Sequence, residues 1–179
     1  MKLLRTIRLD PSDTFVFDTA AEPGEWAVTG GFVFLDADVD RLEGRARTAF
    51  RGGFLGIASL GWSTLAQIVE ASEEDRADVE DTLARQLVRR FGAPDMSSAR
   101  GAAAEEIAFV QSLCDHPGGT LIAMHRVLDA GSIRETFRTL RPREGAKPAR
   151  AFAFLEVAGE GEEPGDDVDI VGLARDERK

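Results

Sequence analysis

The amino-acid sequence predicts an α+β protein with a largely antiparallel sheet. Aromatic and β-branched runs bounded by Gly, Pro and Asp occupy the first third of the chain and return after residue 119, and such runs are typical of strands. The strongest helical periodicity lies between them, over residues 72–114. Because strands and helices do not alternate along the chain, the pattern favours this class over a parallel sheet with crossover helices.

The first third contains four short apolar runs that predict strands. A Gly-Gly pair separates the last two of these runs. Such a pair between two strand-like runs predicts a hairpin or a bulge. The four predicted strands are residues 3–9, 15–17, 26–29 and 32–35.

Three helices are expected. Apolar residues spaced by three and four predict a short helix over about residues 38–50 and longer ones over about 73–91 and 98–114. Both ends of the 73–91 helix are marked, because Ser72 suits the N-cap and Gly92 suits the C-terminal end. The inward residues of the last helix are predicted to be Ala104, Ile107, Ala108, Val110 and Cys114.

The remaining apolar runs complete the sheet. Residues 62–70 are apolar on both faces, which favours a central strand. Residues 120–140 predict a hairpin, and residues 151–157 predict the last strand. We therefore expect a single α+β domain over residues 1–157, followed by an acidic, partly disordered tail over residues 158–179.

The charge of the chain argues against nucleic acid as a partner. The sequence has 32 acidic and 22 basic side chains, which give a formal net charge of −10 and a pI near 4.7. Binding to nucleic acid depends on basic side chains that neutralise phosphates. The single cysteine also excludes an internal disulfide and any site built from several thiolates.

The sequence predicts a cytoplasmic protein without a membrane span. Charged residues interrupt the N-terminal segment within its first ten positions, so this segment lacks the apolar stretch of a secretory signal. The only long uncharged run covers residues 52–69. Its glycines and hydroxyl-bearing residues favour a buried core segment over a membrane helix.

Glycines gather in residues 52–61, which makes this region the first candidate for a ligand site. Gly52, Gly53 and Gly56 can form a backbone-lined turn that approaches a ligand, or tight turns that serve the backbone alone. A phosphate-binding P-loop is excluded, because residues 3–146 contain no lysine.

Cys114, His116 and His125 are the second candidate, because with Asp115 they are the only cluster of metal-capable side chains. A tetrahedral zinc site needs three or four protein ligands, and the chain has only two histidines and one cysteine. Cys114 lies on the apolar face of its predicted helix, where a free cysteine packs as a small hydrophobic residue. We therefore predict neither a metal nor another cofactor.

Two further surfaces are candidates for interaction. Arg134 and Arg138 fall on the same face of a predicted strand, and this face is either solvated or covered by the acidic tail. A short apolar segment near the C-terminus can dock on a partner, or add a strand to this sheet or to that of a second copy. This segment consists of Val168, Ile170, Val171 and Leu173.

Three short motifs resemble those of a bacterial family of unknown function. They are Ala46-Arg47-Thr48-Ala49-Phe50, Gly53-Phe54-Leu55-Gly56 and Gly61-Trp62-Ser63-Thr64-Leu65. The resemblance extends over most of residues 1–157 and assigns no catalytic residue. Genes of this family often lie beside accessory genes for molybdenum-dependent formate dehydrogenase, so the resemblance implies a role in assembly or maturation.

Two functions from different classes remain open. The sequence favours a non-catalytic accessory protein whose partner is another protein or a second copy of itself, since it shows no convergent set of catalytic groups. The alternative is a small enzyme or ligand-binding protein that uses residues 52–61 with Cys114 or His116.

Overall fold

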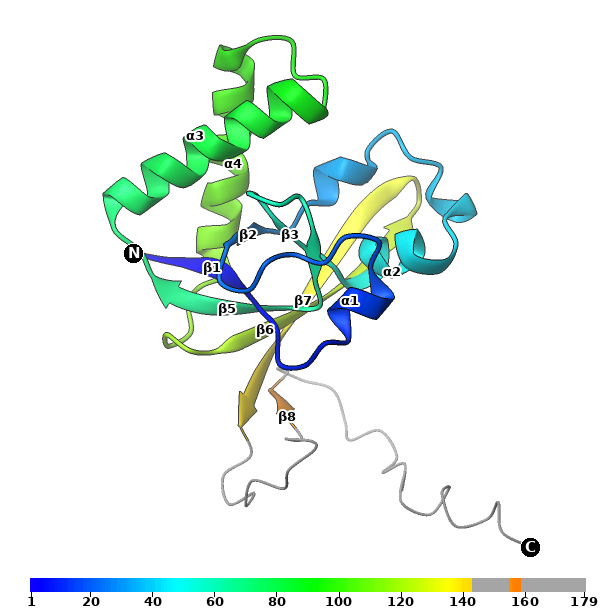
Figure 1. Cartoon of the computed structure of the whole chain (residues 1–179), viewed down its shortest axis with the longest axis vertical. Coiled ribbons are helices and arrows are strands. Elements are labelled where there is room, and N and C mark those ends of the chain that lie inside the picture. Colours follow the sequence, from blue (N-terminus) through cyan, green and yellow to red (C-terminus); the bar gives the residue numbers. More distant parts are fainter. Residues whose placement is uncertain (143–154, 159–179) are drawn as a thin grey trace, which may run out of the picture.

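One antiparallel sheet organises the part of the chain that the computed structural model describes, residues 1–142 and 155–158. The strand order across this sheet is β4-β3-β2-β1-β5-β6-β7-β8, and neighbouring strands pair antiparallel throughout (Figure 1). The predicted α+β class is therefore confirmed. The strands are β1 (Lys2–Ile7), β2 (Trp26–Val28), β3 (Phe54–Gly56), β4 (Trp62–Ser63), β5 (Leu65–Glu70), β6 (Leu121–Asp129), β7 (Ser132–Pro142) and β8 (Leu155–Ala158).

Several sequence predictions fall on residues outside the described ranges. The predicted strand over 151–157 is described only from Leu155, where β8 pairs with β7. The predicted acidic tail lies outside the described residues from residue 159 onward. The same holds for the apolar segment made of Val168, Ile170, Val171 and Leu173.

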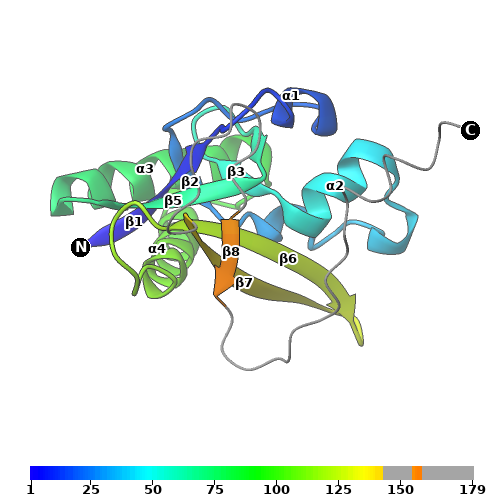
Figure 2. The ribbon, with the colours of Figure 1, turned by 90° about the horizontal axis from the view of Figure 1, so that it is seen from below.

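Two long helices pack together against the strands. Helix α4 (Met96–Ser112) contacts β1 and β2, and helix α3 (Glu73–Arg90) packs against α4 (Figures 1 and 2). None of the described helices is long and apolar enough to cross a membrane. The buried hydrophobic residues form one large cluster and one small cluster, and burying each large side chain of the large cluster stabilises the fold by roughly 1.5–3 kcal/mol. The fully buried members of the large cluster include Leu4, Ile68, Leu83, Ile107 and Ile122.

The ends of α3 confirm the predicted capping. Ser72 Oγ accepts a hydrogen bond from Asp75 N at 3.0 Å, and an Asp75 carboxylate oxygen accepts one from Ser72 N at 2.9 Å. Such a reciprocal pair satisfies two backbone donors that the first turn leaves free. At the other end Gly92 takes a φ of +72°, a conformation that favours glycine.

The boundaries of α4 differ slightly from the predicted 98–114. The helix begins at Met96, two residues earlier than predicted. Asp95 is its N-cap, and the Asp95 carboxylate accepts a hydrogen bond from Ser98 N at 2.8 Å. The helix ends at Ser112, so Cys114 lies just beyond it. Ala108 was predicted to face inward but is exposed. The buried stripe instead consists of Ala99, Ala103, Ile107 and Val110.

The predicted strand over residues 15–17 is wrong. The chain forms a single helical turn, α1 (Asp13–Val16), because the carbonyls of Pro11 and Ser12 accept hydrogen bonds from the backbone that follows. Phe15 is 68% exposed whereas Phe17 is buried. An apolar run of three residues therefore contributes only one side chain to the core, and its aromatic content does not indicate a strand.

The predicted strand over residues 32–35 and the predicted Gly-Gly hairpin are also wrong. Gly30 takes a φ of +73°, which turns the chain out of the sheet and into a short 3-10 helix, η1 (Gly31–Phe34). The ring of Phe34 packs edge-to-face on Phe50 and is stacked with Trp62. Tertiary packing of the aromatic ring thus overrides the strand propensity of the run.

The predicted helix over 38–50 is present in two pieces. A short 3-10 helix, η2 (Val39–Arg41), is followed by the α-helix α2 (Gly44–Gly52). Leu42 separates them with an extended backbone, at ψ of 131°. The apolar spacing predicts helical structure here but does not reveal this break, because Val39 and Leu42 pack on the same small cluster as Phe50.

The predicted strand over 62–70 consists of β4 and β5, and β5 lies centrally between β1 and β6 as expected. β4 lies at the edge of the sheet. Residues 19–21 run along it, since Trp62 N donates to Thr19 O at 2.8 Å and Ala21 N donates to Trp62 O at 2.9 Å. This segment forms an isolated parallel bridge between Ala20 and Trp62.

The predicted hairpin over 120–140 is confirmed as β6 and β7, which pair along their length. Arg134 and Arg138 were predicted to share one face of β7, and both are exposed. The opposite face of β7 carries Ile133, Glu135 and Phe137, all half-buried. This inner face forms one wall of the candidate site.

Candidate functional site: an acid-lined groove beside a buried arginine

The most unusual side chain in the described structure is Arg126, whose guanidinium is fully buried. Nε donates to Glu135 Oε1 at 2.8 Å, one terminal nitrogen donates to Phe50 O at 2.7 Å, and the other donates to Thr29 O at 2.6 Å. Arg126 therefore connects the hairpin to the end of α2 and to the end of β2. These bonds satisfy a charge that would otherwise be costly to bury.

The register of the hairpin explains how the ion pair forms. Arg126 and Glu135 are directly opposite each other in the antiparallel ladder, so their side chains project to the same face. The rings of Phe34 and Phe50 flank the guanidinium, with ring centres 5.5 and 5.9 Å from its central carbon. The aromatic rings exclude water from the arginine side of the pair.

Glu106 brings a second carboxyl group to the same place from α4. Its Oε1 accepts hydrogen bonds from Thr29 Oγ1 at 3.0 Å and from Gly30 N at 3.3 Å. Burial raises the pKa of Glu106 above its ordinary value of 4.5, the two hydrogen bonds partly oppose this, and the charge of Glu135 raises it further. Glu106 thus holds its proton to a higher pH than a solvated glutamate.

Two adjoining cavities open at Glu106. One of about 310 Å³ lies between η1, α4 and the hairpin, and one of about 300 Å³ lies between α3 and α4. They share Glu106 and Phe109, and we call them together the Glu106 groove. At its rim Leu35 is 73% exposed and Phe109 is 40% exposed. Its other lining residues are Thr29, Gly31, Phe32, Leu83, Leu87, Ala102, Glu105, Ile133 and Glu135.

The residues of the groove suit binding. Its walls are largely apolar, while its floor presents two carboxyl groups in different environments, one paired with Arg126 and one buried without a cation. Such a lining can accommodate a molecule that combines apolar surface with a polar or cationic group. None of its lining residues is a Ser, Cys, His or Lys, the usual nucleophiles of covalent catalysis.

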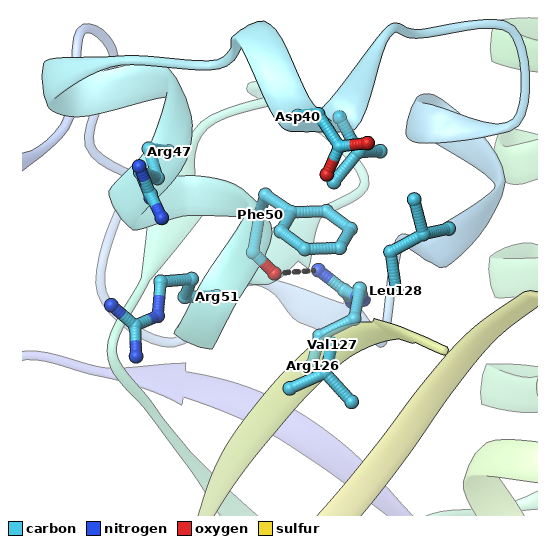
Figure 3. Close-up of a pocket in the computed structure, with 8 residues that line it drawn as sticks. Asp40, Arg47, Phe50, Arg51, Arg126, Val127 and Leu128 are labelled. Atoms are coloured by element: carbon cyan, nitrogen blue, oxygen red, sulfur yellow. Dashed lines mark hydrogen bonds between the residues drawn. The ribbon is translucent and has the colours of Figure 1, made fainter. Parts of the chain in front are cut away.

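A third cavity, of about 250 Å³, lies on the other side of Arg126. Figure 3 shows Arg47 and Arg51 on one side of it, Asp40 across from them, and Phe50 between, with its carbonyl accepting the Arg126 hydrogen bond. Arg47 and Arg51 are exposed on α2, so both guanidinium groups are solvated. The buried network centred on Arg126 therefore separates this basic pocket from the acidic groove.

The glycine-rich region lies away from the residues lining the groove, and its glycines are covered by the protein itself. A Cβ at Gly53 would lie 2.7 Å from the Trp62 ring, and one at Gly52 would lie 3.4 Å from Met124 O. A Cβ at Gly56 would meet the carboxylate of Glu25.

The turn after Gly56 does bind an anion, as a backbone-lined turn can, but the anion belongs to the chain. One carboxylate oxygen of Glu25 accepts hydrogen bonds from Ala58 N and Ser59 N, both at 2.9 Å. Ser59 Oγ donates to the other oxygen. A ligand at this turn would have to displace Glu25.

The second set of sequence candidates lies outside the groove. Cys114 is 3% exposed, its thiol donates to Val110 O at 3.3 Å, and burial raises its pKa to about 11. His116 lies in the loop after α4, where its backbone carbonyl accepts a hydrogen bond from Lys2 at 2.7 Å. His125 is exposed on β6. Within residues 1–142 and 155–158, no three His, Cys, Asp or Glu side chains are placed to hold a metal ion.

Sequence reasoning missed the groove, although two signals for it were present. Arg126 lies on the same face of β6 as the buried residues Ile122 and Met124, and a charge in that position needs a buried partner. Glu106 falls between Ala103 and Val110 on the buried stripe of α4. Both are charged residues within apolar patterns.

The fold and the groove define an α+β protein built on one antiparallel sheet, with an acid-lined groove beside it. The chain belongs to DUF6505, a family of unknown function, whose sequence model matches residues 1–154. This match confirms the resemblance seen in the three sequence motifs. No curated protein and no solved structure matches the chain significantly.

The pKa of Glu106 predicts a pH-dependent effect of Glu106→Gln on stability. Glutamine keeps an oxygen that accepts from Thr29 and Gly30, but it never becomes charged. Because the folded-state pKa of Glu106 is raised, the protonated form stabilises the fold below pH 4.5, and this contribution is lost as pH rises through the folded-state pKa. The Gln variant should therefore gain stability relative to the natural protein as pH rises.

Thermal unfolding from about pH 4 to about pH 8 measures this difference, since 1 kcal/mol moves Tm by about 2–4 °C in a chain of this size. Glu105 is the exposed neighbour of Glu106 and serves as the control. Glu105→Gln should not gain stability relative to the natural protein as pH rises. A difference in Tm that stays constant with pH would contradict the prediction.

Proposed function

We propose that this protein is a non-catalytic accessory protein that binds a partner protein through the Glu106 groove. The observation that carries the proposal is the exposure of Leu35 and Phe109, at 73% and 40%, beside two adjoining cavities of about 310 and 300 Å³. Large exposed apolar side chains around a concavity are typical of protein interaction sites. The proposed location is the cytoplasm, where this acidic chain meets its partner.

The surroundings of the groove support a preformed binding surface. Arg126 holds the hairpin against the end of β2 and against α2 through two buried hydrogen bonds, to Thr29 O and Phe50 O. Phe109 in turn packs edge-to-face against Phe137 of β7, with ring centres 6.0 Å apart. A surface fixed in this way loses little conformational entropy on binding, which favours affinity.

The resemblance noted in the sequence suggests the first partner to test. Its implied association with formate dehydrogenase accessory genes favours a redox metalloenzyme such as formate dehydrogenase, whose maturation this protein would assist. A second copy of the chain is the other partner that the sequence leaves open. Both are outcomes of the same experiment.

A native pull-down with the tagged full chain tests the proposal. Leu35→Ser and Phe109→Ser remove apolar surface at the groove, whereas Leu9→Ser removes a side chain that is 60% exposed elsewhere. We expect the natural chain and Leu9→Ser to retain a stoichiometric partner, and the two groove variants to lose about tenfold or more of it. Circular dichroism checks that each variant is folded.

Three results would decide against the proposal or redirect it. Equal retention by all variants would exclude the groove as the binding surface. A complex containing only this chain, dissociated by Phe109→Ser in sedimentation experiments, would identify a homodimer. A small molecule or metal on the purified protein, detected by native mass spectrometry, would favour the alternative that the sequence raised for residues 52–61 with Cys114 or His116.

A further inference from the structure

The charges on the floor of the groove indicate what the partner presents to it. Among the residues lining the two cavities, Glu105, Glu106 and Glu135 are acidic and none is basic. The nearest compensating charge is Arg126, which is fully buried behind Glu135 and already bonded to it. The lining residues of the groove therefore carry more acceptors than cationic donors, which favours an incoming cationic group.

The hydrogen bonds on the floor leave acceptor atoms available. Glu106 uses Oε1 for Thr29 and Gly30, and Glu135 uses Oε1 for Arg126. The side-chain and backbone hydrogen bonds of the described residues to these two groups with resolved geometry all go to Oε1. Neither second oxygen is sealed from solvent, since the only unpaired buried side-chain atom among the described residues is Arg8 Nε. Both second oxygens are free to accept from a ligand.

The rim restricts what can reach these oxygens. Leu35, Phe109 and Ile133 line the same cavity as the two carboxyl groups. A partner group that reaches the acids therefore lies beside apolar side chains as well. Lysine and arginine meet this requirement, because each carries a charged head on a long apolar stem.

We infer that the groove takes a lysine or arginine side chain from a segment of the partner protein, with apolar residues next to it that pack on Leu35 and Phe109. This inference rests on the proposed function and specifies its partner chemistry. The cation pairs with Glu106 and Glu135, in a setting where a charged hydrogen bond is stronger than in water. The apolar neighbours supply area and exclude water from the pair.

Selection from a random peptide display library on the full-length protein tests the inference. Peptides that bind the natural chain are counter-selected on Phe109→Ser, so that those dependent on the groove are kept. We expect these peptides to be enriched in lysine or arginine flanked by apolar residues. One selected peptide is then synthesised with its basic residue and with glutamine in that position, and binding is measured by fluorescence anisotropy.

The expected result is that the glutamine peptide binds about tenfold more weakly than the basic peptide. Glu106→Gln should weaken binding of the basic peptide by a similar factor. Glu74→Gln, which replaces an exposed residue of α3 outside the groove, should leave this binding unchanged. The glutamine peptide should bind equally to the natural protein and Glu106→Gln.

The outcomes separate this inference from the function on which it rests. Groove-dependent peptides without a basic residue, or a basic peptide insensitive to Glu106→Gln, would overturn the inference and leave the binding function intact. A selection that yields no peptide dependent on Phe109 would overturn the inference. Retention of the native partner by Phe109→Ser in the pull-down would overturn the proposed function as well.

Discussion

Replacing Arg126 with methionine is expected to destabilise the protein by about 3–5 kcal/mol. The guanidinium is fully buried and bonded to Glu135 and to the backbone carbonyls of Thr29 and Phe50. Without it, the half-buried Glu135 carboxylate lies beside Glu106 with no cation, and two carbonyls lose their donor. Equilibrium denaturation with urea measures the change in unfolding free energy.

Two further variants make the result specific to the buried pair. Arg126→Met combined with Glu135→Met removes both charges, so it should recover much of the loss. Arg134 pairs with Asp129 on the exposed face of the hairpin, and its side chain is 70% exposed. Arg134→Met should therefore lower the unfolding free energy by less than about 1 kcal/mol. An Arg126→Met variant as stable as Arg134→Met would show that the buried network does not support the fold.

Gly61→Ala is expected to destabilise the protein by about 1–3 kcal/mol. A Cβ at Gly61 would lie 2.5 Å from the carbonyl carbon of Ala20 and 2.6 Å from Ala21 N. Both neighbours are backbone atoms, which cannot move aside by changing a rotamer. The same denaturation experiment measures the effect.

Gly101→Ala is a matched control for this substitution. Gly101 lies inside α4, and an added Cβ there meets nothing within 4 Å. Alanine at this position should stabilise the helix by about 0.5–1 kcal/mol. Effects of the same sign at both glycines would contradict the argument, since only Gly61 is packed against another segment.

The sequence predicted those elements whose signals are local. Helix α3 has its N-cap at Ser72, its acidic first turn and its terminal glycine within the segment itself, so its bounds were nearly correct. The β6–β7 hairpin likewise has its turn and its alternation in consecutive residues. The failures have two causes: a local helical turn begun at Pro11 and Ser12 replaces the strand over residues 15–17, whereas contacts with distant residues decide residues 32–35. Phe34 packs on Phe50 and Trp62, and no local pattern reveals those partners.

The site was predictable only in part for the same reason. Glycines attract attention in a sequence, yet Gly53 and Gly56 serve close packing against Trp62 and Glu25. The groove is assembled from residues on η1, α4 and β7 that are up to about a hundred positions apart. Glu106 and Arg126 were visible as charges within apolar patterns, and the hairpin register places Glu135 opposite Arg126. The bonds of both residues to Thr29, by contrast, depend on how distant elements pack together.

The way residues 19–21 cover β4 has a consequence for aggregation. An open strand at the edge of a sheet is a template on which another chain can add a strand, and such addition leads to insoluble assemblies. Here the backbone of Trp62 is already engaged by Thr19 and Ala21, and β4 is only two residues long. This edge is therefore protected as long as that segment stays in place. Because Gly61 allows the close approach to Ala20, its substitution should also make the protein more prone to precipitate.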